Sequence, residues 1–183
     1  MTPGVWLLLL GGLVLLLLAW TVWTLVRLTR LEARVARAWT ALDTQLQRRA
    51  GLAEELAREH PGVLGTERAQ YLAAFAADAR APADGDRELA ENLLGRELRD
   101  LPPGPPGVPT ALRTDLAGTG TRVALARRFY NDAVRDTVSL RRGRVPRLFR
   151  LGGAEPLPAF FEIDDTLPAA PAPVPPGADA RGR

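Results

Sequence analysis

The residues best suited to catalysis are the single histidine, His60, and the three glutamates before it, Glu54, Glu55 and Glu59. Such a cluster could transfer protons. The 183-residue chain has no cysteine and no second histidine, which excludes disulfides, thiol nucleophiles and multi-histidine metal sites. A di-iron carboxylate site needs two Glu-x-x-His pairs, whereas alanine stands three residues before His60. We therefore interpret the cluster as a solvated helix end, and the sequence predicts no catalytic residue, cofactor or metal.

Arginines form the second group with possible chemistry. All 24 basic side chains are arginine, and residues 121–150 hold nine of them against two aspartates. The densest part, residues 141–150, contains no acidic residue. Its arginines are candidate contacts for anionic lipids or for a protein partner, because cytoplasmic leaflets are negatively charged. These candidates are Arg141, Arg142, Arg144, Arg147 and Arg150.

A structural alternative stays open for the same stretch, in which Leu148 and Phe149 close the end of a helical domain while the arginines face water. Nucleic acid is not predicted as a partner, since the stretch lacks a nucleic-acid-binding motif and interleaved aromatic residues that could stack on bases. The anionic surface of the neighbouring membrane is a simpler partner for these arginines than nucleic acid.

A third polar group is the Tyr-Asn-Asp sequence at 130–132, in the last predicted helix. One interpretation is a partner-binding surface in which Asn131 acts with the arginines at 127–128. The other is that Tyr130 fills the core, while Asn131 and Asp132 hydrogen-bond across to Asp43 or Gln45 of the first soluble helix and fix the register of a helix bundle. The candidate register residues are then Asp43, Gln45, Tyr130 and Asn131.

Residues 4–26 form an apolar run without one ionisable side chain. As a helix the run is roughly 34 Å long, enough for a hydrocarbon core of about 30 Å. No positive residue precedes it and no small-residue cleavage site follows it, which favours a retained anchor over a signal peptide. Arginines follow at 27, 30, 34 and 37, so the positive-inside rule predicts that the N-terminus lies outside the cell membrane and the C-terminal domain in the cytoplasm.

The apolar pattern beyond the anchor is helical, with steps of three and four residues. It predicts one rod from about residue 5 to residue 59, ended by Pro61. Two shorter helices follow, one carrying the apolar residues from Leu64 to Ala79 and one those from Leu89 to Leu98. The second of these has a cap at 84–86. After a proline-rich linker, Thr110 is predicted to cap a last helix.

The predicted fold is therefore all-α. It comprises an N-terminal single transmembrane helix (1–26), an antiparallel four-helix bundle (27–165) and a disordered Pro/Ala-rich tail (166–183). The short helices are expected to cover only the half of the rod away from the membrane. A homo-oligomer is predicted for that reason, because the apolar residues nearer the membrane would be incompletely covered. They are Leu28, Leu31 and Val35.

Two segments carry a family resemblance. The sequence AWTALDTQLQRRAGLAEEL at 38–56 resembles the first soluble helix of the LemA family, with its pattern AW-x-x-[IL]-D-x-Q-L-x-R-R-x-x-L. The sequence TRVALARRFYNDAVRD at 121–136 resembles that family's last helix. The chain departs from the family at Gly118 and Gly120, where acidic residues are usual, and at His60-Pro61. The resemblance implies a membrane-attached antiparallel four-helix bundle and supplies no activity.

These observations lead to the hypothesis of a non-enzymatic, single-pass membrane protein whose cytoplasmic helical bundle serves protein interaction or scaffolding. Its predicted partners are membrane lipids, further copies of the chain and an unidentified protein. The alternative hypothesis is a regulatory binding module that controls another membrane protein. An enzyme is the third.

Overall fold

The computed structural model describes residues 3–82, 85–101, 107–143 and 156–164. The described residues are helical or irregular and include no strand, which confirms the all-α class for this part of the chain. The predicted tail lies outside them. The helices are α1 (Pro3–Glu59), α2 (Pro61–Leu64), α3 (Thr66–Arg80), α4 (Arg87–Arg99) and α5 (Thr110–Arg141).

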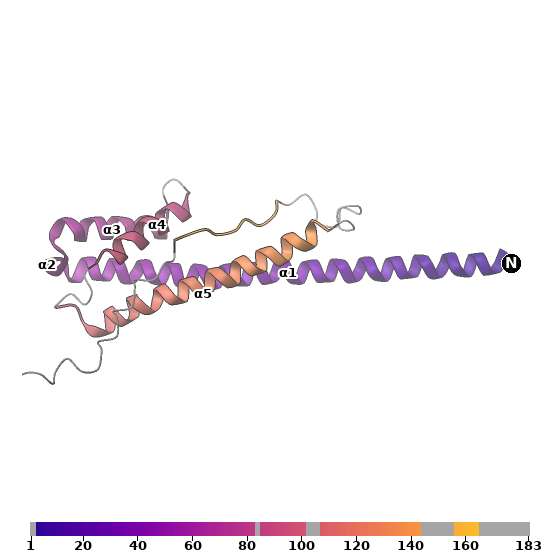
Figure 1. Cartoon of the computed structure of the whole chain (residues 1–183), viewed down its shortest axis with the longest axis horizontal. Coiled ribbons are helices and arrows are strands. Elements are labelled where there is room, and N and C mark those ends of the chain that lie inside the picture. The colour runs from indigo at the N-terminus through magenta and orange to yellow at the C-terminus, as the bar shows by residue number, and fades with distance from the viewer. Residues whose placement is uncertain (1–2, 83–84, 102–106, 144–155, 165–183) are drawn as a thin grey trace, which may run out of the picture.

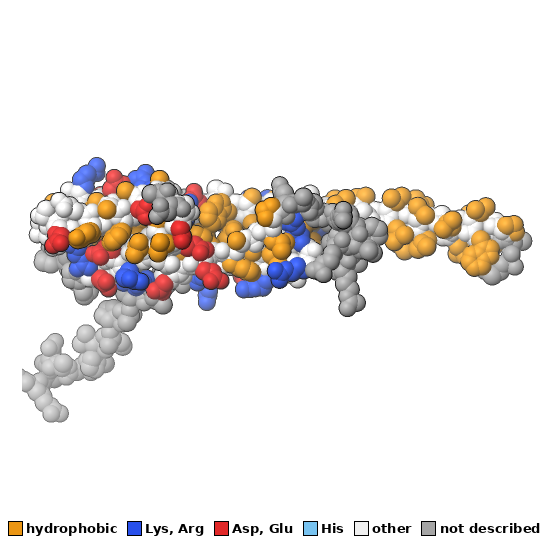
Figure 2. Space-filling model, turned by 90° about the horizontal axis from the view of Figure 1, so that it is seen from above, with side chains coloured by type: hydrophobic (Ala, Val, Ile, Leu, Met, Phe, Trp, Pro, Cys, Tyr) orange, Lys and Arg blue, Asp and Glu red, His pale blue; other side chains and the backbone are white. Residues whose placement is uncertain are grey.

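The longest helix, α1, is one uninterrupted rod (Figure 1). It contains an 18-residue stretch with a mean hydropathy of 2.5, none of which is buried, and it is the one described helix long and apolar enough to cross a membrane. Figure 2 shows hydrophobic side chains along this exposed end of the molecule, whereas charged side chains gather over the rest. The prediction of a continuous helix as far as residue 59 is confirmed.

The other half of α1 carries the buried stripe. Leu42, Leu46, Ala50 and Ala53 are completely inaccessible to solvent. Residues three and four apart share one face of a helix, so this spacing aims them all at the helices that pack on α1. The stripe continues to Leu56 and stops with the helix at Glu59.

Two short helices and α4 follow. Gly65 separates α2 from α3, because its φ of +83° lies in the left-handed region that favours glycine and ends a right-handed helix. The expected single helix from Leu64 to Ala79 is therefore wrong at its start. The predicted cap of α4 is confirmed, since the Asp86 side chain accepts a hydrogen bond of 2.9 Å from the backbone N–H of Leu89.

The last helix, α5, begins at Thr110 itself, with Pro109 at the N-cap position, so the prediction that Thr110 caps it is wrong. The Thr110 hydroxyl instead accepts a hydrogen bond of 3.0 Å from Arg113. The helix continues through Gly118 and Gly120. Each glycine costs about 1 kcal/mol relative to alanine. The complete burial of Thr119 and Val123 around them offsets that cost.

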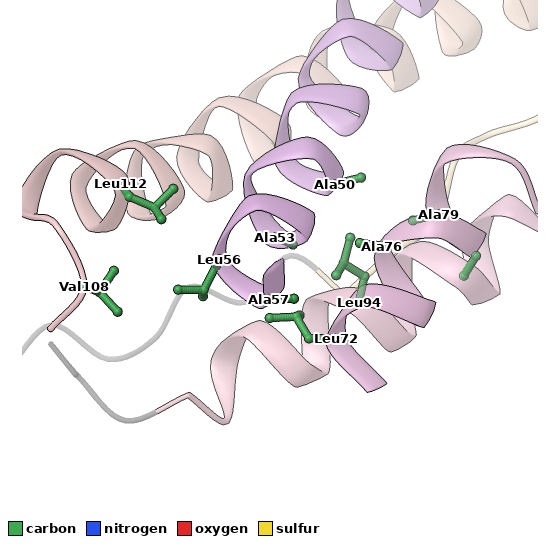
Figure 3. Close-up of a cluster of buried hydrophobic side chains, with 11 residues drawn as sticks. Ala50, Ala53, Leu56, Ala57, Leu72, Ala76, Ala79, Leu94, Val108 and Leu112 are labelled. Carbon is green, nitrogen blue, oxygen red and sulfur yellow. The ribbon is translucent and has the colours of Figure 1, made fainter. Parts of the chain in front are cut away.

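The buried apolar residues form two clusters. The first lies where α3, α4 and the start of α5 meet the far half of α1, and it includes Leu56, Leu72, Leu94 and Leu112 (Figure 3). The second lies further along α1 and includes Leu42, Leu46, Val123, Tyr130, Val134, Phe161 and Ile163. Helices supply the first cluster apart from Val108, which lies in the connection before α5, whereas the second needs two residues from the non-helical stretch 156–164.

α5 lies along α1 and reaches beyond the short helices. Asp115 of α5 pairs with Arg48 at 3.4 Å, and Asp136 pairs with Arg34 at 2.7 Å. α3 and α4 lie only over the half of α1 away from its N-terminus, as expected (Figure 1). The expectation of poor coverage nearer the apolar end of α1 is wrong for Leu28, which is buried, while Leu31 and Val35 are half-buried.

Candidate functional site

The most distinctive contact surface holds an extended stretch of the chain itself. Residues 156–164, here called the C-terminal segment, run back beside α5 towards α4 without forming a helix (Figure 1). Phe161 and Ile163 are buried, whereas Phe160 and Glu162 are exposed. This alternation is the side-chain pattern of a β-strand, although no second strand lies beside it among the described residues. Side chains of α4 and α5 instead form the hydrogen bonds to the backbone of the segment.

Asn131 of α5 is the central contact. Its Nδ2 donates a hydrogen bond of 3.0 Å to the carbonyl oxygen of Phe161, and its Oδ1 accepts one of 2.9 Å from the Phe161 N–H. One amide side chain thus binds both backbone groups of one residue, as a neighbouring strand does in an antiparallel ladder. Next to it, the Tyr130 hydroxyl donates a hydrogen bond of 2.9 Å to the carbonyl oxygen of Ala159.

α4 holds the other side of the C-terminal segment. Glu88 accepts a hydrogen bond of 2.7 Å from the Glu162 N–H, and the Asn92 side-chain oxygen accepts one of 2.7 Å from the Asp164 N–H. Arg99 donates to Asp164 twice, to the carbonyl oxygen at 3.1 Å and to the carboxylate at 2.8 Å. The contacts are therefore mostly to backbone atoms, with one ion pair at the end.

The apolar floor beneath the segment is Trp39 of α1. Its ring centroid lies 5.6 Å from that of Phe161 in an edge-on arrangement and 5.2 Å from that of Tyr130. Burial, together with the negative charge of Glu88, raises the pKa of Tyr130, so its hydroxyl stays protonated and able to donate. We call the residues that hold the segment the segment site: Trp39, Glu88, Asn92, Arg99, Tyr130 and Asn131.

The predicted register residues have different partners from those expected. Asn131 binds Phe161 rather than Asp43 or Gln45. Asp43 instead pairs with Arg87 of α4 at 2.5 Å, and the Gln45 side-chain oxygen is buried without a hydrogen-bond partner among the described residues. Tyr130 is buried in the second cluster, as the sequence indicated. The hydrogen bonds of Tyr130 and Asn131 thus fix the C-terminal segment rather than the register of α1 against α5.

A buried ion pair joins α1 to α4 and was not expected from the sequence. Arg49 and Glu91 are 6% and 1% exposed, and the Arg49 guanidinium donates to both the carboxylate and, at 3.2 Å, the carbonyl oxygen of Glu91. Burial raises the pKa of the Glu91 carboxyl, and the positive charge of Arg49 opposes that rise. The sequence did carry one signal that Arg49 is buried. Arg49 lies three residues after Leu46 and four before Ala53, and so falls on the apolar stripe.

The remaining candidates lie apart from the segment site. Glu54 pairs with Arg80 at 2.8 Å, Glu59 contacts Arg58 at 3.1 Å, and His60 stands at the turn between α1 and α2. No group of three or more metal-ligating side chains was found in the described part of the chain. A surface pocket of about 570 Å³ lies beside the segment and is lined by Arg127, Asn131, Arg135, Phe160, Glu162 and Ile163.

Two of the five candidate arginines are described. Arg141 is the last residue of α5 and donates a hydrogen bond of 3.3 Å to the carbonyl oxygen of Pro156, and Arg142 is exposed. Asp136 pairs with Arg34, and Arg141 lies roughly 7.5 Å further along α5, so this end of the helix points towards the apolar part of α1. Arg144, Arg147 and Arg150 lie outside the described residues.

No family model, curated protein or solved structure matches this chain. The LemA resemblance therefore stays a prediction. Two features of the molecule bear on its function: the long helix that joins an exposed apolar end to a packed domain, and the segment site.

Proposed function

We propose that this chain is a non-enzymatic, single-pass membrane protein that presents a cytoplasmic helical bundle for protein interaction or scaffolding. The observation that carries the proposal is the continuity of α1. The same helix is fully exposed and apolar at one end and forms the centre of the packed domain at the other. Because the helix has no break, the domain is held in a fixed direction relative to the end proposed to lie in the membrane.

The anchor is proposed to be residues 1–26, with the N-terminus outside. Support comes from the exposed apolar side chains of this stretch and from the arginines that follow it, beginning with Arg27 and Arg30. Trp23 supports an interface at this point, because its ring lies 5.5 Å beneath the Arg27 guanidinium, and both side chains favour the boundary between lipid and water.

The domain is proposed to be an antiparallel four-helix bundle of α1, α3, α4 and α5 within residues 27–165. The order of the two ion pairs supports opposite directions for α1 and α5: Arg48 pairs with Asp115, and the earlier Arg34 pairs with the later Asp136. The resemblance to the LemA family supports the same arrangement. The C-terminal segment adds to this bundle a non-helical element that closes its second cluster.

Lipid is proposed as the partner of the arginine end. Arg141 and Arg142 stand at the end of α5 that points towards the anchor, where a basic side chain near an anionic leaflet gains about 1 kcal/mol. The arginines at 144, 147 and 150 extend the same charge along the sequence.

Affinity capture from detergent-solubilised membranes tests the proposed function. Cells should express two full-length copies with different tags, and one tag is used for capture. Recovery of the second tag supports a scaffold built from this chain, and recovery of a different protein in fixed ratio supports the regulatory alternative. A turnover that is abolished when His60 is replaced would contradict a non-enzymatic role.

A further inference from the structure

The C-terminal segment is bound as a separate peptide ligand is bound. Side chains of α4 and α5 hold its backbone, and the buried Phe161 and Ile163 fill the second cluster. This mode resembles the addition of an extended peptide to a sheet edge, in which main-chain hydrogen bonds give affinity and alternate side chains give specificity. The site therefore binds an extended stretch with two apolar residues two positions apart, followed by an acidic residue that pairs with Arg99.

The stretch of chain that joins α5 to the C-terminal segment is long enough for a neighbouring copy to supply the segment. Arg141 and Pro156 are 15 positions apart, although they lie within hydrogen-bond distance. Fully extended, 15 residues span roughly 50 Å. A chain of this length is long enough to reach a copy that stands directly beside it, and every contact made by the segment is the same when another copy supplies it. Exchange of an identical element between copies is a low-cost route to association.

We propose that the segment site binds residues 159–164 of a second copy, so that neighbouring chains associate by exchanging their C-terminal segments. This inference rests on the proposed function as an interaction protein and names the partner of the segment site. The tethered segment has an effective concentration of about millimolar. This tethered segment competes with the segment of a neighbour, so exchange requires that anchored copies, held in one orientation, be crowded in the membrane to a local concentration of about the same size.

Two complementary full-length variants test the exchange. Copy A carries Phe161→Ala and Ile163→Ala, which weakens its segment and leaves its site intact. Copy B carries Asn131→Ala, which removes both hydrogen bonds to Phe161 and leaves the segment intact. Copies with different tags are co-expressed, solubilised in mild detergent and captured. The A–B pair should be enriched roughly tenfold over A–A and B–B pairs, because only the mixed pair joins an intact site to an intact segment.

The matched control changes the exposed neighbours in the same segment, Phe160→Ala and Glu162→Ala. This copy should associate as the unchanged chain does, since neither side chain lies in the second cluster. A second measurement removes the dependence on folding of copy A. Unchanged chains labelled with donor and acceptor dyes are placed in one bilayer, where energy transfer should rise with density and fall when both copies carry Asn131→Ala.

The outcomes separate the two proposals. Equal capture of A–B and A–A pairs, or energy transfer that is indifferent to Asn131→Ala, overturns the exchange. If the unchanged copies still capture one another in that case, the scaffold proposal stands and a different surface joins them. If they capture only a distinct protein, the exchange falls and the regulatory alternative gains support.

Discussion

Replacing the buried Arg49–Glu91 pair should have opposite consequences for one partner and for both. Glu91→Leu leaves the Arg49 guanidinium buried without its counter-charge, and loss of one partner of a buried pair costs about 3–5 kcal/mol. The side chains are 7% and 0% exposed, so water cannot replace the missing partner. For a domain of this size, that loss lowers the melting temperature by roughly 10 °C. Changing both residues, Arg49→Met with Glu91→Leu, should be neutral or stabilising, because desolvation of both charges is relieved.

The pH dependence separates the two single variants. In Arg49→Met, the remaining Glu91 carboxyl is buried, and loss of the guanidinium raises its pKa further above the ordinary value of 4.5. A raised pKa in the folded state favours folding below the unfolded value, and this contribution is lost as pH rises through the folded pKa. The destabilisation of Arg49→Met should therefore be large at pH 8 and smaller at pH 5. Glu91→Leu should show no such recovery, because arginine keeps its proton throughout this range.

The measurement is unfolding of the full-length chain in detergent, followed by circular dichroism at both pH values. The double variant serves as the reference, since the shared contributions of surface carboxylates cancel against it. If the double variant is as unstable as Glu91→Leu, the pair is net stabilising and the desolvation reasoning is refuted. Equal losses for Arg49→Met at pH 8 and pH 5 would show that Glu91 does not take up a proton when its partner is removed.

Three further outcomes are expected. A cytoplasm-active reporter fused after Asp165 should be active and an extracytoplasmic one silent; the reverse pattern contradicts the orientation. Tyr130→Phe removes the hydrogen bond to Ala159 and should cost about 1 kcal/mol in unfolding free energy, measured beside Phe129→Ala as an exposed control. A protein lacking residues 1–26 should bind anionic vesicles in low salt and release them in high salt, and glutamine at the candidate positions should abolish binding; the positions are Arg141, Arg142, Arg144, Arg147 and Arg150.

The helices could be predicted because their signals are local. Steps of three and four along α1, the Asp86 cap and the prolines around residue 61 each act within one or two turns of the helix they shape. The errors at Gly65 and Thr110 are also local. Glycine permits both helical and left-handed backbone, and a threonine before an apolar run fits a cap or a first turn equally well.

The segment site could not be predicted in the same way, because its contacts join residues 29 or more positions apart. Because residue 131 is asparagine, its side-chain amide needs hydrogen-bond partners. Its place in the last helix indicates that it is partly buried. Neither observation identifies the backbone or side-chain group that hydrogen-bonds to this amide. A sequence signal for the segment was the alternation of Phe161 and Ile163 with the acidic residues Glu162 and Asp164, which is too short to distinguish from an ordinary loop.

The buried ion pair and the segment site are connected through the rotation of α4 about its own axis. Glu88 and Asn92 are four residues apart and lie on one face, which holds the segment, whereas Glu91 lies on the neighbouring face towards Arg49 of α1. A turn of α4 that separated Glu91 from Arg49 would carry Glu88 and Asn92 away from the backbone of residues 162–164. The charged pair therefore orients the site as well as joining two helices. Ala90 and Leu94 of α4 are also buried in the first cluster, so the apolar contacts and the charged pair favour the same rotation of the helix.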